Sequence, residues 1–459
     1  MTLKEELAKA RATISDLRAA LAEAKATIAK LRAEVAQLRS ELNRSTVELR
    51  EAARQAARFR RPESKKVKPE DKKRCGRKAG HRGAYRAEPQ HVDHHVEQKL
   101  DCCPNCTGPL TDRRSLTQFI EELPPIRPIV TRLVTWSGRC AQCGDVRSTH
   151  PLQTSLAQGS AGNMLGPRAA AFAVWLNKHH GVTQRKTCRI FKEGFGLSLT
   201  SGGLSQLLDR AARKMQDKYD QLIEEIRGSP AVHVDETSWY VGRAGYWLWV
   251  FSTPSITVYR IASSRGHPVA KAVLGDEFDQ VLISDCAAMY DKFDCPRHLC
   301  IAHHQKAIKE QRASAPESSY LHVCASFFRD VVELAHARAD LPPEEFAARD
   351  AAIRKRAERL LHQYVTEPQD CKIQNRLKRC GEGLLGCLTY DVDPTNNLAE
   401  RDLRPAVISR KVSCGNKTTS GARTSEILQS LAATAHKQGQ DFLSNVAAAI
   451  RVSSTAPVR

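Results

Sequence analysis

The sequence lacks any long run of apolar residues. No stretch of its 459 residues approaches the roughly 18 to 20 uninterrupted apolar residues of a membrane-spanning helix. The opening MTLKEELAKA also lacks the apolar segment of a secretory signal. We therefore expect a soluble cytoplasmic protein with no membrane partner.

Acidic residues are also scarce relative to basic ones. The chain has 71 Lys and Arg against 51 Asp and Glu, which gives a formal net charge of +20. Such an excess favours a polyanionic partner such as nucleic acid, although a membrane surface would also attract it. The length exceeds what one hydrophobic core usually supports, so we expect several domains in a multidomain α+β protein. Fifteen cysteines in a reducing compartment suggest metal binding where they cluster and packing where they do not.

Glycine and proline are absent from residues 1–53. Apolar side chains recur there every seven residues in two interleaved series: Leu7, Ile14, Leu21, Ile28, Val35, Leu42 and Leu49, and Leu3, Ala10, Leu17, Ala24, Leu31 and Leu38. This spacing predicts the seam of a coiled coil, a leucine zipper through which the chain forms a homo-oligomer. A single amphipathic helix packed on its own protein is the alternative.

Residues 54–90 form a basic linker or arm. Between Arg54 and Arg86 there are fourteen Lys or Arg residues and three acids. This composition resists independent folding but can lie along phosphates. The run GRKAGHRG at 76–83 supplies the candidate DNA-binding residues Arg77, Lys78, His81 and Arg82. A solvated linker is the alternative.

Two CxxC pairs lie within residues 91–155. Cys103 and Cys106 form the first pair, and Cys140 and Cys143 form the second. Two such pairs typically hold one structural zinc ion tetrahedrally, and the intervening sequence suggests the short strands and turns of a zinc ribbon. Cys102 competes with Cys103 as a ligand, and a redox role is the less favoured alternative because neither pair opens a helix.

Residues 156–228 are helical in pattern. A helix, a turn around 194–196 and a second helix starting near Thr200 or Ser201 have the layout of a DNA-binding helix-turn-helix. A plain helical spacer fits equally well.

A sheet follows at 229–303. Three strand-like segments, a helix and a fourth strand (AVHVDETSWYV, YWLWVFST, TVYRIA, PVAKAVLGDEF and QVLISDC) occur in the order of a ribonuclease H-like α/β core. Asp235 and Asp285 would then lie side by side on adjacent strands. A carboxylate on a buried strand is costly unless it is paired or metal-bound, and Mg²⁺ or Mn²⁺ prefers oxygen ligands. Two such ions would serve displacement at phosphorus.

Glu400 is the candidate third acid. Asp393 is expected to cap its helix, with Pro394 in the first position. Asn396 and Asn397 share its face by helical spacing. Glu382 and Glu426 compete for the role. Nearby cations could contact DNA phosphates: Arg401, Arg404, Arg410 and Lys411.

Residues 304–390 read as a helical insertion that divides the core, and residues 391–459 as its second part with C-terminal helices. Cys300 and His303 form a CxxH pair at the entrance, for which we favour packing or local hydrogen bonding. His298 and His304 nearby keep a metal possible.

Taken together, these motifs resemble the transposases of the insertion sequence 66 family, which are bacterial proteins. The resemblance rests on the zipper, GRKAGHRG, CPNC and CAQC, HVDETSWYV, LISDCAAMY, CIAH and NNLAERDLRPAVISRK with GNKTTSGAR. It implies that Asp235, Asp285 and Glu400 are the acid triad of a DDE transposase and that the four cysteines form a zinc finger. It also implies binding to double-stranded DNA at element ends and target, association with the nucleoid, and companion proteins of the same element.

The resemblance implies a two-step reaction. Water attacks the phosphodiester at the element's end and frees a 3′ hydroxyl, which then attacks target DNA. Two alternatives remain: a non-catalytic zinc-containing DNA-binding regulator, and a nuclease without joining activity.

Overall fold

The computed structural model describes residues 87–124, 126–156 and 163–452, together with ten positions between 23 and 45. Those ten positions are helical, and the heptad residues Leu31, Val35 and Leu38 among them are exposed. The rest of the predicted coiled coil and the whole run GRKAGHRG lie outside the described residues. The chain divides into two compact units, Met1–Leu123 and Pro124–Arg459.

The zinc-ribbon prediction of short strands between the CxxC pairs is wrong for most of that segment. Among the described residues from 87 to 136 there is no strand, and the first strands are β1 (Ser137–Cys140) and β2 (Gly144–Arg147), an antiparallel hairpin. The apolar side chains of the segment are exposed, as at Ile120 and Ile129. Pro124 and Pro128 cannot donate to a strand ladder.

Four α-helices follow the hairpin: α2 (Pro167–Val174), α3 (Gln184–Phe195), α4 (Ser201–Lys214) and α5 (Gln216–Arg227). A π-helical turn, η2 (Trp175–His179), continues α2. Gly196 ends α3 in a left-handed conformation that glycine adopts without strain, and the Thr200 side chain caps α4 by accepting from the Gly203 N–H. The predicted turn and the predicted start of the second helix are therefore confirmed.

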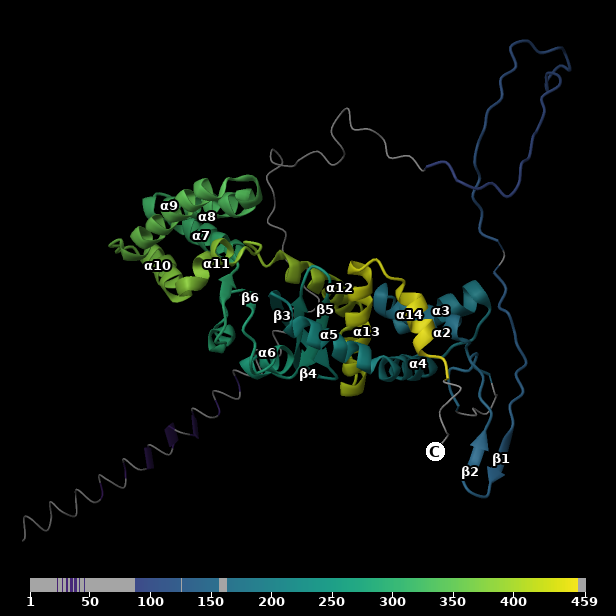
Figure 1. The fold of residues 1–459 in the computed structure, drawn as a ribbon, viewed down its shortest axis with the longest axis horizontal. Coiled ribbons are helices and arrows are strands. Elements are labelled where there is room, and N and C mark those ends of the chain that lie inside the picture. Colours follow the sequence, from purple (N-terminus) through teal and green to yellow (C-terminus); the bar gives the residue numbers. More distant parts are fainter. Residues whose placement is uncertain are drawn as a thin grey trace, which may run out of the picture. The chain divides into compact units, whose positions relative to one another are not determined.

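A five-stranded mixed sheet has the order β5-β4-β3-β6-β7, and Figure 1 labels its strands β3, β4, β5 and β6. Its strands are β3 (Ala231–Val241), β4 (Ala244–Ser252), β5 (Thr257–Ala262), β6 (Val281–Ser284) and β7 (Arg297–Leu299). The first three pair antiparallel, and β6 joins parallel to β3 after α6 (His267–Leu274). A 3-10 turn, η3 (Ala288–Lys292), precedes β7. Three strands, a helix and a parallel strand is the order that the sequence predicted.

The two faces of the sheet pack against different helices. Val232, Val234 and Phe251 belong to a hydrophobic cluster that also contains residues of α2, α4 and α5, so the helices before the sheet share a core with it. Val250 and Tyr259 point to the other face, where they pack against α12 (Asn397–Ser413). Because strand side chains alternate, Asp235 points to the same face as its cross-strand partner Val250.

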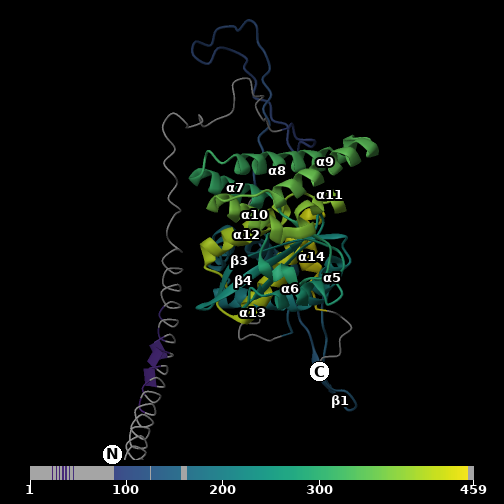
Figure 2. The same ribbon diagram turned by 90° about the vertical axis from the view of Figure 1, so that its left-hand side faces the viewer.

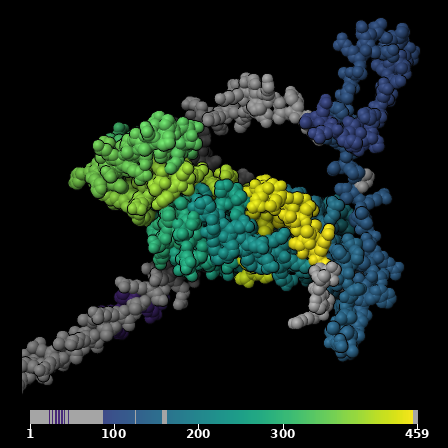
Figure 3. Space-filling model, viewed as in Figure 1, coloured from purple at the N-terminus to yellow at the C-terminus, as the bar shows by residue number. Residues whose placement is uncertain are grey.

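The segment between β7 and α12 folds around a hydrophobic cluster of its own. It consists of α7 (Ile301–Ser314), α8 (Ser319–Ala337), η4 (Arg338–Asp340), α9 (Pro343–His362), α10 (Pro368–Cys380), η5 (Gly381–Leu385) and α11 (Gly386–Tyr390). Helices α7 to α10 stack over one end of the sheet (Figure 2), and the space-filling view shows them as a separate green lobe (Figure 3).

Two C-terminal helices complete the second unit: α13 (Thr419–Lys437), which packs along β5, and α14 (Phe442–Ala449), which packs on α2. The backbones of α11 and β7 approach each other closely at Gly386. A Cβ at Gly386 would lie 2.3 Å from the Arg297 carbonyl oxygen, so only glycine fits there. None of the helices in the described part of the chain is both long and apolar enough to cross a bilayer.

Candidate active site

Adjacent parallel strands carry the first two acids of the candidate site. Asp235 lies in the middle of β3, and Asp285 directly follows the last residue of β6. His233 on β3 pairs with Ile283 on β6, and each aspartate lies two residues further along its segment. The prediction that they come from neighbouring strands is confirmed.

The environment of Asp235 disfavours its charged form. Burial raises its pKa to about 7, the negative charge of Glu236 adds to this, and Asp285 and Glu400 contribute further repulsion. The Glu236 backbone N–H donates to Asp235 Oδ1 at 2.9 Å and opposes the rise. The repulsion means that the three acids of the predicted triad lie close enough to interact electrostatically.

A second buried carboxylate, which sequence reasoning missed, lies beside Asp235. The Glu236 side chain accepts from the Tyr290 hydroxyl at 2.6 Å and pairs with Arg265 at 2.6 Å. Burial raises the pKa of Glu236, and both hydrogen bonds oppose the rise. Arg265 also lies over the Trp247 ring. The adjacent acids DE in HVDETSWYV were the available signal: on a strand they point to opposite faces, so each needs its own partner.

The start of α12 is attached to β3 by a fully buried asparagine. His233 Nδ1–H donates to Asn396 Oδ1 at 3.0 Å, and Asn396 Nδ2 donates to the Val234 carbonyl at 2.8 Å. These contacts lie immediately before Asp235 along the strand. Glu400 follows Asn396 by one helical turn, and it lies close enough to Asp235 for its charge to raise the pKa of that carboxyl.

The predicted helix start at Asp393 and Pro394 is wrong by three residues, because α12 begins at Asn397. Asp393 Oδ1 accepts from the backbone and side chain of Thr395 and forms a local turn instead of a helix cap. Asn396 occupies the cap position, but its side chain bonds β3 and makes no capping hydrogen bond. A tertiary contact has replaced the local one.

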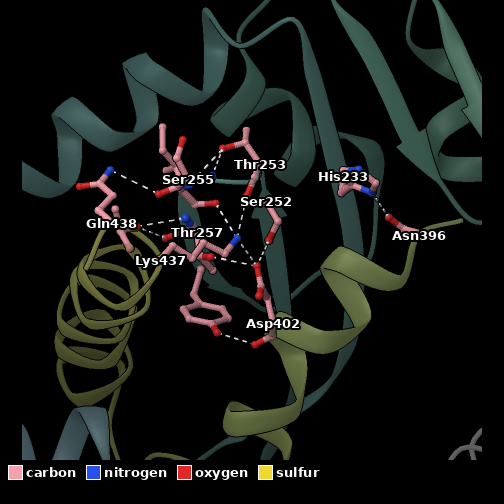
Figure 4. Close-up of polar contacts among 12 residues, drawn as sticks. His233, Ser252, Thr253, Ser255, Thr257, Asn396, Asp402, Lys437 and Gln438 are labelled. Carbon is pink, nitrogen blue, oxygen red and sulfur yellow. Dashed lines mark hydrogen bonds and ion pairs between the residues drawn. The ribbon is translucent and has the colours of Figure 1, made fainter. Parts of the chain in front are cut away.

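A second anchor lies just beyond Glu400 on the same helix (Figure 4). Asp402 Oδ2 accepts from Ser252 at 2.7 Å, from Thr257 at 2.9 Å and from Lys437 Nζ at 2.5 Å. The Tyr259 hydroxyl donates to the Asp402 carbonyl. Asp402 thus ties α12 to β4, β5 and α13, so Glu400 is bracketed by two buried polar contacts.

The competing acids occupy other surroundings. Glu426 on α13 is buried, accepts from the Ile261 backbone N–H at 2.7 Å and pairs with Arg423 at 2.8 Å. Glu382 belongs to η5 and lines a pocket of 440 Å³ with Cys295 and Cys380. Glu400, by contrast, is among the groups whose charge raises the pKa of Asp235.

The predicted DNA-binding cations of α12 differ in their availability. Arg401, Arg404 and Lys411 are exposed. Arg410 instead turns onto β3, where Nη1 donates to Thr237 Oγ1 at 3.2 Å and also to the Ser238 backbone and side chain. The exposed three leave their charges free for a polyanion, while Arg410 fastens the helix to the strand.

The charges at the acid cluster leave room for a cation. Glu236, Asp402 and Glu426 each pair with a Lys or Arg. By contrast, Asp235, Asp285 and Glu400 form no such ion pair in the described part of the chain. A divalent cation would relieve the raised pKa of Asp235, and a set of carboxylate oxygens suits Mg²⁺ or Mn²⁺.

Each CxxC pair forms a tight turn whose backbone N–H groups bond its first sulfur. Hydrogen bonds from the Asn105 and Cys106 backbones lower the pKa of Cys103. In the second unit, those from Cys143 and Gln142 lower the pKa of Cys140 at the end of β1. Both turns stabilise thiolates, the form that binds zinc.

Within the CxxH pair, Cys300 contributes to packing and to a local hydrogen bond. Its sulfur is buried and accepts from the Asn396 backbone N–H at 3.1 Å. His298 Nδ1 accepts from the Cys387 N–H at 3.0 Å. His304, in contrast, lies with Cys286 and Cys380 in a group whose ligand atoms are all within 4.8 Å of one another.

Comparison with protein-family models identifies a family for the part of the chain that contains this site. Residues 162–424, more than half of the chain, match the family model described as Transposase IS66 family. This stretch runs from the first helices through the sheet and insertion into α13, and includes all three acids. Comparison with curated proteins found no match.

Proposed function

This chain belongs to the IS66 family of transposases, and we propose that it cuts the ends of a mobile element and joins them to target DNA. Family membership implies DNA binding and use of divalent metal ions. The proposal adds that Asp235, Asp285 and Glu400 hold two Mg²⁺ or Mn²⁺ ions in a ribonuclease H-like core. The observation that carries it is that Asp285 and Glu400 lie close enough to Asp235 for their charges to raise its pKa, while none of the three forms an ion pair within the described part of the chain.

Two divalent ions, when bound, would activate the attacking oxygen and stabilise the leaving oxygen of an in-line displacement at phosphorus. The chain's own residues position that chemistry. Asn396 and Asp402 hold α12 against the sheet on either side of Glu400. The ion pair with Glu236 holds the Arg265 guanidinium near Asp285, the residue that follows β6.

DNA would approach along α12 and the basic segments. Arg401, Arg404 and Lys411 are exposed on the helix that carries Glu400, so phosphates held there lie next to the acids. We extend the proposal to Arg77, Lys78, His81 and Arg82 in the arm and to helices α3 and α4. We likewise propose that Cys103, Cys106, Cys140 and Cys143 hold a structural zinc ion and that residues 1–53 form the coiled coil of a homo-oligomer.

The test is Mg²⁺-dependent cleavage and strand transfer on double-stranded DNA carrying the element's ends. Asp235→Asn, Asp285→Asn and Glu400→Gln each remove one charge with little change in shape. We expect all three to lose both steps while retaining DNA binding. Glu382→Gln, at the competing acid of η5, is the matched control and should retain both.

The outcomes separate the alternative functions. Cleavage without joining would indicate a nuclease, and binding without cleavage, even with companion proteins added, would indicate a DNA-binding regulator. If Glu400→Gln alone remained active, another acid would have to complete the triad.

A further inference from the structure

A cluster of two cysteines and a histidine connects the sheet to the helical insertion. Cys286 lies in the loop after β6, His304 on α7 and Cys380 at the end of α10. His304 and Cys380 are buried, and Cys286 is half-buried. The ligand atoms of these three described residues all lie within 4.8 Å of one another, close enough to bind one metal ion together.

The distances agree with those expected around one tetrahedral ion. His304 Nε2 lies 3.6 Å from Cys286 Sγ and 3.8 Å from Cys380 Sγ. Zinc bonds of about 2.3 Å to sulfur and about 2.0–2.1 Å to nitrogen, at a tetrahedral angle, separate the two ligand atoms by about 3.6 Å. The three side chains therefore surround a point at bonding distance from all three ligand atoms with little movement.

We propose that Cys286, His304 and Cys380 bind a thiophilic divalent ion of the zinc class. Soft thiolate and imidazole ligands select zinc over Mg²⁺, so this site is chemically distinct from the carboxylate cluster. It is also separate from the two CxxC pairs, whose cysteines it does not use. The inference rests on this cluster alone and holds whether or not the acids catalyse DNA cleavage.

The surroundings suit a site of this kind. Arg376 and Arg379 on α10 lie against the cluster, where they donate to His304 Nδ1 at 3.3 Å and to the Cys286 carbonyl at 2.8 Å, so positive charge lies close to the two sulfurs. Of the three residues, Cys380 also lines the 440 Å³ pocket.

Ion binding requires one rearrangement. Arg376 Nε donates to His304 Nδ1 at 3.3 Å, so the imidazole proton lies on Nε2 in this arrangement. When Nε2 binds a metal, that proton moves to Nδ1, Arg376 turns away, and the Cys286 and Cys380 thiols release their protons to solvent. Two thiolates then balance the two positive charges of the ion.

The position of the site gives it a structural role. Cys286 is the residue after Asp285, and its two partners belong to the helical insertion. An ion at this point would fix the β6 loop to α7 and α10. Without it, the loop is held by weaker contacts such as the bond from Arg379 to the Cys286 carbonyl at 2.8 Å.

The experiment uses the full-length chain with Cys103→Ser and Cys140→Ser, which removes the predicted CxxC zinc site. The protein is purified without oxygen, given zinc, freed of excess and analysed for bound metal. We expect one zinc ion per chain, with loss of that ion in Cys286→Ser and in Cys380→Ser. Cys371→Ser, on the same helix as Cys380 but outside the cluster, is the control and should keep it.

Alkylation in the same background tests the site without further substitutions. Bound zinc should slow iodoacetamide labelling of Cys286 and Cys380 by at least about tenfold, since the thiolate lone pairs are engaged, and leave Cys371 unchanged. Equal labelling rates with and without zinc, or a background chain that holds no zinc, would overturn the proposal. So would zinc that persists in both cysteine variants.

Discussion

Replacing Asn396 with alanine removes the contact that attaches α12 to the strand of Asp235. The substitution leaves the His233 Nδ1–H without its acceptor and the Val234 carbonyl without its donor, both in a buried setting. A buried polar group left without a partner costs about 1–3 kcal/mol. Because the carbonyl has two lone pairs and the histidine can adjust, we expect a total loss of about 2–4 kcal/mol in the free energy of unfolding.

Urea denaturation measures this loss, and Asn397→Ala is the matched control. Asn397 is the next residue, is exposed, and should change stability by no more than about 0.5 kcal/mol. Asn396→Asp keeps the acceptor for His233 but loses the donor to Val234, so its cost should fall between the two.

The same variants test the link from Asn396 to Glu400. Below the temperature at which Asn396→Ala unfolds, we expect Mg²⁺-dependent cleavage to fall at least about tenfold while DNA binding stays unchanged, because a misplaced metal ligand removes transition-state stabilisation. A variant with the stability and cleavage rate of the wild type would show that Asn396 neither stabilises the fold nor positions Glu400. Lower stability with unchanged cleavage would show that Asn396 holds the fold without positioning Glu400.

Three further predictions concern pH and packing. Burial lowers the pKa of His298 to about 4, below the value in the unfolded chain. The free energy of unfolding should therefore decrease as the pH falls from about 6.5 towards 4. Urea denaturation should show a loss of about 2 kcal/mol between pH 7 and pH 5, and His298→Gln should lack this loss. The pKa of Asp235 is raised to about 7, so Mg²⁺, which binds the carboxylate, should bind about tenfold more weakly at pH 6 than at pH 8; calorimetry showing equal affinities would exclude Asp235 as a ligand. Gly386→Ala should cost about 3 kcal/mol in thermal unfolding because its Cβ meets backbone, whereas Gly202→Ala, a helical site in open space, should cost nothing.

Local physics explains why the elements around the site were predictable. The end of α3 is predictable because Gly196 readily adopts a left-handed conformation, and the start of α4 is predictable because the Thr200 side chain caps a helix. The strand of Asp235 follows from a run of β-branched and aromatic residues. Where local signals conflicted with packing, the prediction was wrong: Asp393 resembles a helix cap, but α12 starts later because Asn396 bonds β3.

Spacing, composition and side-chain period are enough to predict the order of strands and helices, the excess of basic residues and which acids lie on neighbouring strands. Which buried polar groups meet depends instead on tertiary packing. The pairings of Glu236 with Arg265, of Asp402 with Lys437, and of Cys286 with His304 and Cys380 join distant segments. No local pattern encodes such contacts, because a buried charge or thiol takes whatever partner the packing of the sheet and the insertion brings within reach.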